Sequence, residues 1–333
     1  MKAITYDRFG AAQDVLTLTE LDIPDPAAGE VRVDLVYSGV NPSDVKARAG
    51  TRPGVTKPAY PQIIPHSDGS GVITSVGAGV DPSRIGDRVW IWNGQWQRAF
   101  GTAATQITLP EHQAVRLPGT ASFETGAVLG IPGLTAAHVV LAGGDVSGKT
   151  LLIQGGAGTV GYLAIQLAKW AGARVIATAR GDGIARCEAA GADAVLDYSA
   201  ADLAQLVLAA NQGQAVDRIV EVEFGSNIET DTTVIAPNGT IAAYGSALNM
   251  TPKLPFYPLL FKAVTIDIVL IYLLSPAERQ SAITHLHAAL ADNALQCPVE
   301  RVFTLPETAA AHEAVQAGAR AGAILVDVTA DML

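Results

Sequence analysis

Cysteine is scarce in this sequence, which contains 333 residues and only two cysteines, Cys187 and Cys297. No Cys-x-x-Cys pair occurs anywhere in the chain. Small domains held by disulfides and structural zinc lobes both need more cysteines at closer spacing. The sequence therefore argues against a disulfide framework and against a structural zinc site.

Excess positive charge and long apolar runs are absent as well. The formal net charge is −10 and no long basic run occurs, so we expect neither nucleic acid nor an anionic membrane surface as a partner. The most apolar stretch, residues 264–274, contains Asp267 and is shorter than the roughly 20 residues of a membrane span. The amino terminus has no apolar run typical of a signal peptide, which predicts a cytoplasmic protein.

The length of the chain exceeds what one compact core usually holds, so two domains are expected. The first part is rich in β-branched residues, and Pro/Gly turns separate its short runs. Closely spaced strands with such turns predict a barrel-like or sandwich domain. The expected strands are residues 2–6, 16–21, 30–40, 69–76, 87–91 and 104–109.

The pattern changes after Pro118, where apolar strands begin to alternate with Ala-rich helices. This alternation continues to about residue 272 and predicts a parallel, doubly wound sheet. The expected strands are residues 151–154, 174–179, 194–197, 217–222 and 240–245.

The carboxyl-terminal part combines both kinds of element. Ser275 is a plausible N-cap, and Pro276 at the first helical position then opens an amphipathic helix over 275–295. Residues 301–305 and 323–328 are expected as strands that return to the first domain. We therefore predict one discontinuous domain, 1–121 with 273–333, and a second domain over 122–272.

The strongest motif is a glycine-rich turn between an expected strand and an expected helix. Gly156, Gly158 and Gly161 satisfy G-x-G-x-x-G, a spacing that lets the backbone approach a pyrophosphate while the helix packs closely on the strand. The free N–H groups at the helix start would bind the phosphates. The same turn could also be a glycine-rich connection without a ligand. The expected cofactor-binding residues of this turn are Gly155, Gly156, Ala157, Gly158, Thr159, Val160 and Gly161.

The end of the second strand distinguishes between the two nicotinamide cofactors. NAD sites usually place an acidic residue there to bind the ribose hydroxyls, whereas this chain has Ala179 and Arg180. A guanidinium can bind the 2′-phosphate of NADP in a bidentate manner. Asp182 is the competing ribose ligand, and Arg180 could instead be a solvated surface arginine. We predict NADPH as the cofactor.

Several segments in this order resemble the zeta-crystallin-like quinone oxidoreductases, the zinc-free branch of the medium-chain dehydrogenase/reductase superfamily. The resemblance covers nearly the whole chain. Its segments are SGVNPSDVKARAG (38–50), PHSDGSGVITSVGAGV (65–80), GDRVW (86–90), LGIPGLTAAH (129–138), GGAGTVG (155–161) and GADAVLDY (191–198).

The resemblance implies an α/β protein, a Rossmann doubly wound parallel sheet plus a GroES-like β-barrel domain, with the active site in the cleft between them. It implies NADPH, with quinones or other activated double bonds as hydride acceptors. Asn41 would then lie near the nicotinamide and substrate, and Thr135 would contact the cofactor. Tyr198 would approach the adenosine 2′-phosphate. The residues implied beside the nicotinamide half are Tyr244, Gly245 and Ser246.

Some positions depart from the pattern of that family. Lys46 stands where these enzymes often have a substrate-side tyrosine, and Gly183 stands where many have a lysine for the 2′-phosphate. Glu221 and Glu223 make the end of the fourth Rossmann strand more acidic than usual. These departures bear more on the substrate than on the fold.

A catalytic zinc is not expected. Zinc-dependent relatives need a cysteine in the region 38–41 and a His-Glu pair near 66, where this chain has Ser38, Asn41 and His66-Ser67. One histidine cannot supply the three protein ligands that catalytic zinc requires. We therefore predict no metal and interpret His66 as a hydrogen-bonded histidine of the core or of the cleft.

Hydride transfer needs little from side chains, because the cofactor carries the chemistry. A quinone or enone that accepts hydride develops an oxyanion, and the candidate stabilisers are Asn41, Lys46 and Tyr244. Asp44 and Lys46 could equally be an exposed loop pair. Tyr60 and Trp96 are candidates for an apolar substrate pocket, as are Trp90 and Trp92, for which packing in the barrel core is an equal alternative.

Three functions remain open at this level. The first is an NADPH-dependent quinone or enone reductase, and the second is a zinc-free alcohol dehydrogenase or carbonyl reductase. The third is not an enzyme but an NADPH-binding structural or sensor protein. The apolar strand 264–272 is expected as the last strand of the parallel sheet, and the family resemblance implies that it lies at the sheet edge, where pairing with a second copy predicts a homodimer.

Overall fold

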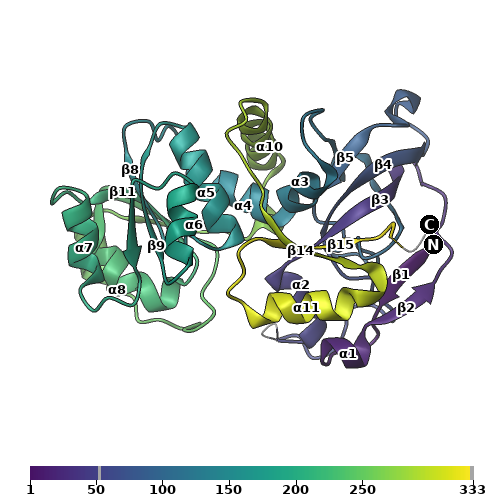
Figure 1. The fold of residues 1–333 in the computed structure, drawn as a ribbon, viewed down its shortest axis with the longest axis horizontal. Helices are drawn as coiled ribbons and strands as arrows, with labels where there is room; N and C mark the ends of the chain where they lie inside the picture. Colours follow the sequence, from purple (N-terminus) through teal and green to yellow (C-terminus); the bar gives the residue numbers. More distant parts are fainter. Residues whose placement is uncertain (52–53, 331–333) are drawn as a thin grey trace. The chain divides into compact units, whose positions relative to one another are not determined.

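The computed structural model describes residues 1–51 and 54–330. The chain divides into two compact units (Figure 1). Unit 1 comprises Met1–Ile131 and Cys297–Leu333, and unit 2 comprises Pro132–Gln296. Unit 1 is therefore built from both ends of the chain.

Unit 1 is organised around a mixed sheet with the strand order β14-β15-β3-β4-β5-β7, in which β6 also pairs with β3. The long strand β3 (Glu30–Val40) is central, because alternate residues from Val31 to Leu35 are buried and face the core. The other strands are β4 (Asp68–Val76), β5 (Arg88–Ile91), β6 (Gln106–Pro110), β7 (Ala114–Arg116), β14 (Val299–Thr304) and β15 (Ala323–Asp327), with the separate hairpin β1 (Lys2–Thr5) and β2 (Thr17–Glu20).

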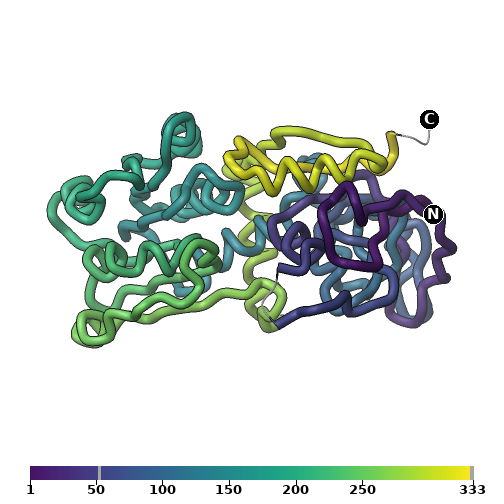
Figure 2. Tube along the Cα trace, turned by 90° about the horizontal axis from the view of Figure 1, so that it is seen from below, coloured from purple at the N-terminus to yellow at the C-terminus, as the bar shows by residue number. Residues whose placement is uncertain are grey.

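The carboxyl-terminal strand β15 pairs antiparallel with β3, with Ile324 opposite Val40. Figure 2 shows the yellow carboxyl-terminal segment lying beside the purple amino-terminal segments. The helices of unit 1 are α1 (Ala12–Val15), α2 (Pro42–Ala49), α3 (Phe123–Val128) and α11 (Thr308–Ala317). The helix α2, which carries Asp44 and Lys46, was not expected from the sequence, where these two residues could equally have been a loop pair.

Unit 2 contains a six-stranded parallel sheet with the order β10-β9-β8-β11-β12-β13. Numbered along the chain, this is the order 3-2-1-4-5-6 of a doubly wound sheet, which confirms the predicted fold class. The strands are β8 (Thr150–Ile153), β9 (Arg174–Ala179), β10 (Ala194–Asp197), β11 (Val216–Glu221), β12 (Ile235–Ala243) and β13 (Thr265–Ile268).

Helices cover both faces of this sheet, with α5 and α6 on one side and α7 and α8 on the other (Figure 1). The central helix α5 has eight buried residues, from Gly161 to Ala168, because small and aliphatic side chains let it pack closely on the strands. The helices are α4 (Leu134–Leu141), α5 (Thr159–Trp170), α6 (Gly183–Ala189), α7 (Leu203–Ala210), α8 (Phe224–Val234), α9 (Phe256–Phe261) and α10 (Pro276–Ala291).

The edge strand β13 is shorter than the predicted strand 264–272. It pairs with β12 only over Thr265–Ile268, and the chain then turns into the 3₁₀ segment Ile271–Leu273. The reason is that β12 itself ends at Ala243, whose carbonyl oxygen accepts the N–H of Val269 at 2.8 Å. Beyond that point no strand of the described residues continues the ladder.

The two units also divide later in the chain than the predicted domains, whose boundaries followed residues 121 and 272. Helix α3 packs on β3, β4 and β5, which keeps its residues with unit 1. Helix α10 packs on α4, which keeps its residues with unit 2. One helical stretch, Phe123–Leu141, is long and apolar enough to span a membrane by composition alone, but 78% of its most apolar window is buried, as in a core helix.

Candidate nucleotide site and substrate-side residues

The glycine-rich turn connects β8 to α5 at the carboxyl edge of the parallel sheet. Helix α5 begins at Thr159, and its N-cap Gly158 has no side chain to bind the first N–H groups. The first N–H groups of an α-helix lack acceptors within the helix, and the helix dipole adds positive potential there. The turn therefore presents free donors that fit a phosphate group.

Gly161 is required by close contact and not only by the motif. A Cβ atom on Gly161 would lie 2.5 Å from the carbonyl oxygen of Gly155 and 2.7 Å from the Cα of Gly156. No side chain fits at those distances without moving the backbone of the turn. The motif therefore shapes the turn in the way that a dinucleotide site needs.

Two residues that the sequence analysis did not identify form hydrogen bonds with the backbone of the turn. The buried Thr178 on β9 accepts the N–H of Gly155 through its hydroxyl at 3.0 Å, and its carbonyl oxygen accepts the N–H of Gly156 at 2.8 Å. Arg186 donates from Nε to the carbonyl oxygen of Ala157 at 2.9 Å. Its guanidinium also lies 4.4 Å from the ring centre of Tyr162. Arg186 thus brings a positive charge to the turn.

Arg180 and Tyr198 lie at the ends of two neighbouring strands, as the cofactor prediction needs. Arg180 follows β9 and is exposed. Tyr198 follows β10, is 52% exposed, and donates its N–H to the carbonyl oxygen of Ala179 at 3.2 Å. The carboxylate of Asp197 is also close to Arg180: hydrogen bonds from Ser199 lower the pKa of Asp197, and the charge of Arg180 lowers it further.

The three residues predicted beside the nicotinamide follow β12 at the same edge of the sheet. Burial and the nearby Glu221 raise the pKa of Tyr244, so its hydroxyl stays protonated and can only donate or accept a hydrogen bond. The carbonyl oxygen of Gly245 accepts the N–H of Phe224 at 3.0 Å. The hydroxyl of Ser246 accepts the N–H of Gly225 at 2.8 Å and donates to Asn249, so it holds its own loop.

Thr135 is buried as the second residue of α4, at the start of the helix as predicted. Thr135, the glycine-rich turn, Arg180, Tyr198 and the segment 244–246 all belong to unit 2. Asn41 and Lys46 belong to unit 1.

Asn41 is the N-cap residue of α2 and is only 6% exposed. Its side-chain amide donates to Oδ2 of Asp68 at 2.7 Å, and the N–H of Ile131 donates to both carboxyl oxygens of Asp68 at 2.8 and 2.9 Å. Burial raises the pKa of Asp68 well above its usual range, although these hydrogen bonds oppose the shift. Asp68 therefore orients the Asn41 amide, a role that its place in an apolar strand could have suggested.

The residue pair on α2 does not behave as an exposed pair. Asp44 is buried and accepts the backbone N–H of Asn41 at 2.8 Å, which fixes the start of the helix. Lys46 lies on the exposed side of the same helix. Of these two residues, therefore, only Lys46 has a charge that a substrate could contact.

His66 was predicted to lie in the core or in the cleft, and the structure places it in the core of unit 1. It is fully buried, its Nδ1 lies 2.9 Å from the hydroxyl of Ser38, and its Nε2 lies 2.8 Å from Nε2 of His312. Ser38 lies 2.8 Å from the hydroxyl of Thr102, which donates to the carbonyl oxygen of Asp68. Both nitrogens of His66 are thus occupied within the core, and these residues do not fit a catalytic zinc. Among the described residues, no group of three metal-ligating side chains occurs.

The tryptophans divide between core and surface. Trp90 is fully buried and Trp92 is 9% exposed, so both belong to the core of unit 1 rather than to an open pocket. Trp96 and Tyr60 are half-buried, and the hydroxyl of Tyr60 donates to the carbonyl oxygen of Gln97 at 2.6 Å.

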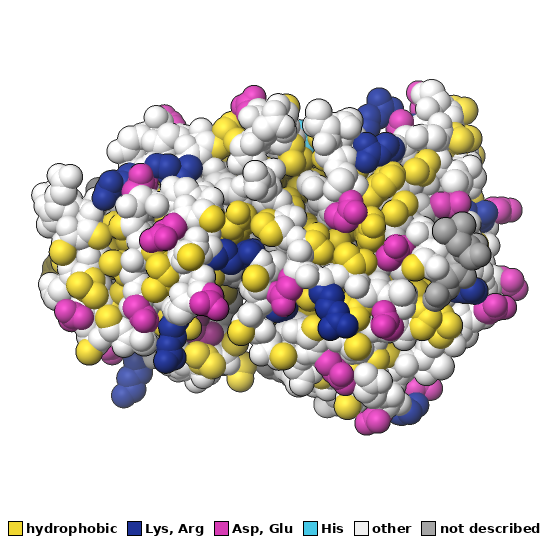
Figure 3. Space-filling model, in the orientation of Figure 1, with side chains coloured by type: hydrophobic (Ala, Val, Ile, Leu, Met, Phe, Trp, Pro, Cys, Tyr) yellow, Lys and Arg dark blue, Asp and Glu magenta, His cyan; other side chains and the backbone are white. Residues whose placement is uncertain are grey.

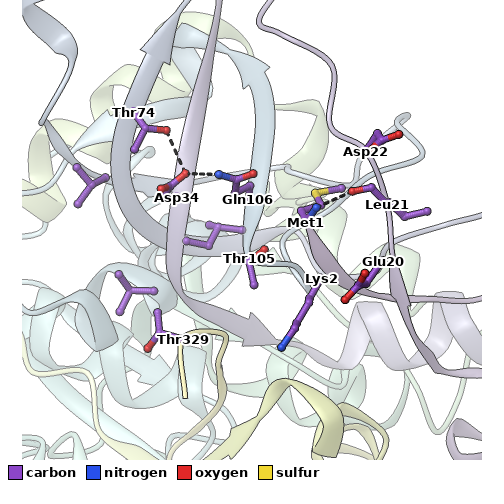
Figure 4. Close-up of a pocket in the computed structure, with 13 residues that line it drawn as sticks. Met1, Lys2, Glu20, Leu21, Asp22, Asp34, Thr74, Thr105, Gln106 and Thr329 are labelled. Carbon is purple, nitrogen blue, oxygen red and sulfur yellow. Dashed lines mark hydrogen bonds between the residues drawn. The ribbon is translucent and has the colours of Figure 1, made fainter. Parts of the chain in front are cut away.

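An open cavity of about 760 Å³ lies elsewhere in unit 1, and it contains none of the predicted site residues (Figure 4). Asp34 lies at its wall and accepts hydrogen bonds from Thr74 at 3.0 Å and Gln106 at 2.8 Å. On the molecular face of Figure 3, acidic and basic side chains are interspersed among apolar ones. Neither this cavity nor this surface indicates a second active site.

Two family models match the chain. Residues 27–142 match the alcohol dehydrogenase GroES-like domain, and residues 159–288 match the zinc-binding dehydrogenase domain. The chain is 30% identical over 271 residues to 2-methylene-furan-3-one reductase of Solanum lycopersicum, covering 77% of this chain and 69% of that protein. It is 29% identical over 259 residues to quinone oxidoreductase of Rattus norvegicus, covering 76% of each. A mycobacterial protein solved in complex with NADPH has a TM-score of 0.85 at 25% identity, covering 98% of this chain and 100% of that one.

Proposed function

Because the chain belongs to the zinc-free quinone oxidoreductase family of the medium-chain dehydrogenases/reductases, we propose that it is an NADPH-dependent reductase of quinones or related activated double bonds. The observation that carries this proposal is the glycine-rich turn over the uncapped start of α5, where Gly161 leaves room for nothing but backbone. The NADPH bound by the mycobacterial neighbour supports the choice of cofactor.

Different residues of unit 2 would bind different parts of the cofactor. The turn from Gly155 to Gly161 would bind the pyrophosphate, and Arg180 with Tyr198 would bind the 2′-phosphate at the ends of β9 and β10. Tyr244 and Gly245 would lie along the nicotinamide half. When bound, the reduced nicotinamide supplies a hydride to an activated double bond.

The residues of unit 1 would act on the acceptor. Asn41 has a side-chain amide whose orientation Asp68 fixes, so its remaining N–H is a preorganised donor for an oxyanion. In unit 1 the exposed Lys46 would add a positive charge, and in unit 2 the protonated Tyr244 hydroxyl is the candidate donor. None of these groups needs to transfer a proton, because solvent can supply it.

The direct test is consumption of NADPH in the presence of a panel of quinones, enones and simple carbonyl compounds, together with formation of NADPH from NADP⁺ and alcohols, with the metal content measured in parallel. We expect turnover with quinones or enones in a metal-free preparation. Metal-free turnover of an alcohol or a simple carbonyl compound, without turnover of any quinone or enone, would favour the zinc-free alcohol dehydrogenase or carbonyl reductase. Tight NADPH binding without turnover of any acceptor would favour a non-catalytic nucleotide-binding protein.

A further inference from the structure

Two carboxyl groups are buried together at the point where the strand order of unit 2 reverses. Glu221 is the last residue of β11 and Asp231 lies in α8, and both side chains are 0% exposed. Strands β8 and β11 are neighbours there, and ligands of doubly wound sheets bind beside the carboxyl ends of such strands. The pair therefore lies next to the proposed nucleotide site.

The hydrogen bonds of the pair show which group carries a proton. Glu221 accepts from Nδ2 of Asn227 at 3.1 and 3.2 Å and from the backbone N–H of Glu223, so it is the ionised partner. Asp231 accepts from Nε2 of Gln154 at 3.1 Å through Oδ1, whereas its buried Oδ2 receives no hydrogen bond from a described donor. Asn227, which lies one turn before Asp231 on α8, binds Glu221, and each carboxyl group acts on the ionisation of the other, so the two groups lie close together. A proton on Oδ2 of Asp231 satisfies both groups.

A continuous chain of hydrogen bonds links this pair to the glycine-rich turn. The hydroxyl of Thr178 donates to Oε1 of Gln154 at 2.7 Å and accepts the N–H of Gly155 at 3.0 Å. Gln154 then donates to Asp231. Gln154 therefore accepts at one end of its amide and donates at the other, and it connects Asp231 to Thr178 through two hydrogen bonds.

We propose that Glu221 and Asp231 form a carboxyl pair that shares one proton and positions the glycine-rich turn, so that nucleotide affinity falls when the pair loses this proton. The inference rests on the proposed function, because it assigns the turn to a nucleotide. Both residues are positioning residues, since neither touches the reacting atoms.

The surroundings of the pair favour the singly charged state. Burial raises the pKa of both carboxyl groups, and the charge of Glu221 raises the pKa of Asp231 further. Glu223 adds a second negative charge. The titratable or charged residues on the elements packed around the pair are Glu223 and Glu229 at the start and in the middle of α8, Asp217 and Arg218 on β11, Tyr244 after β12, Asp202 before α7, and Lys262, which donates to carbonyl oxygens at the end of α8.

Nucleotide binding and the shared proton are then linked in a defined direction. The pyrophosphate brings negative charge to the same end of the sheet, which makes a second negative charge on the pair less favourable. Binding therefore strengthens retention of the proton. By linkage, affinity is greatest at pH values where the pair is protonated, and it weakens as pH rises through the raised pKa of Asp231.

The test is the dissociation constant of NADPH, measured by fluorescence titration from mildly acidic to alkaline pH. Asp231→Asn keeps the charge of the singly protonated pair and both of its hydrogen bonds but has no proton to lose. Asp217→Asn is the matched control, because Asp217 is exposed near the opposite end of the same strand, where it accepts the N–H of Thr150. We expect wild type and Asp217→Asn to weaken by up to about tenfold per pH unit, and Asp231→Asn to stay constant, above about pH 7, where the 2′-phosphate of NADPH is already ionised.

Calorimetry in two buffers with different ionisation enthalpies gives an independent readout. Wild type should take up protons on binding NADPH within the titration range, and Asp231→Asn should not. If Asp231→Asn does not fold, Glu221→Gln carries the same test, because it also holds the pair at a single charge. A wild-type pH dependence that survives in the variant overturns the inference, as does pH-independent binding by wild type. If wild type binds neither NADPH nor NADH at any pH, the proposed function fails as well.

Discussion

At the residue scale, the choice of cofactor depends on one exposed guanidinium. Arg180 follows β9, Tyr198 follows the neighbouring strand β10, and the carboxylate of Asp197 is close to Arg180. That carboxylate would repel a 2′-phosphate if it stood alone. Arg180 therefore has to outweigh a neighbouring negative charge, and no lysine at Gly183 assists it.

Substituting Arg180 should change the cofactor preference more than the overall affinity. We expect Arg180→Ala to weaken NADPH binding by roughly tenfold and to leave NADH binding within about twofold, because only NADPH carries the 2′-phosphate. Titration with both nucleotides measures the ratio. Arg174→Ala, at the exposed start of the same strand, is the control and should change neither value. An equal loss of affinity for both nucleotides would show that Arg180 does not bind the 2′-phosphate.

The buried pair of His66 and His312 predicts an acid-sensitive stability. Burial lowers the pKa of both histidines, that of His312 to about 3, with the charge of Arg48 adding to the shift at His312. In the unfolded chain both histidines take up a proton near pH 6.5. The folded state therefore binds fewer protons, so its stability is fully present above that pH and is lost as pH falls toward the folded pKa values.

Urea unfolding between neutral and acidic pH measures this effect. We expect each histidine to remove up to about 1.4 kcal/mol of unfolding free energy per pH unit in that window. His312→Gln should reduce the slope, because one titrating group is gone while a hydrogen bond to His66 can remain. The exposed His112 provides the control, and His112→Gln should keep the wild-type slope. An unchanged slope in His312→Gln would contradict the prediction.

At the element scale, the start of helix α10 follows directly from local sequence. Ser275 accepts the N–H of Glu278 at 3.3 Å, and the carboxylate of Glu278 accepts the N–H of Ser275 at 2.9 Å. This reciprocal capping satisfies two backbone donors that the helix itself cannot pair. Pro276 occupies the first helical position, where a missing N–H costs nothing.

Removal of this cap should lower the stability of unit 2. We expect Ser275→Ala to cost about 1 kcal/mol of unfolding free energy, measured by urea unfolding at neutral pH. Gln280→Ala on the exposed side of the same helix removes no cap and should be close to neutral. A loss in the Gln280 variant as large as that in the Ser275 variant would mean that the helix surface, rather than its cap, matters here.

At the scale of the whole molecule, we propose that two copies associate through β13. This strand is at the edge of the six-stranded sheet, with Ile268 77% exposed. Exposed apolar side chains continue the surface on either side of it, among them Leu270, Leu273, Phe256, Tyr257 and Phe261. An open apolar edge of this kind is a surface that a second copy can cover.

Sedimentation velocity at micromolar concentration tests the association. We expect wild type to sediment as a dimer and Ile268→Lys as a monomer, because a charge on the paired edge would have to be buried without a partner. Leu18→Lys alters a partly exposed leucine on β2 of unit 1 and should remain dimeric. A monomeric wild type would contradict the proposal, and so would an Ile268→Lys variant that remains dimeric.

Local patterns in the sequence determined much of this protein. The alternation of strands and helices predicted the doubly wound sheet, the glycine spacing predicted the turn before α5, and Ser275 predicted the start of α10. These features depend on neighbouring residues, because helix caps and tight turns are built within a few positions of the chain. The length of β13 was not predictable in this way, since it depends on where its partner strand ends.

Only the tertiary structure decided which distant side chains meet. His66 and His312 are 246 residues apart in the chain, and Asn41 meets Asp68 across 27. In the sequence, Glu221 was only an unusual acidic residue, and nothing near it pointed to Asp231 or to the route through Gln154. Such contacts arise from the order of strands in a sheet and the packing of helices on it. A local sequence pattern predicts each helix or strand by itself. It does not predict which other helix or strand will pack against it.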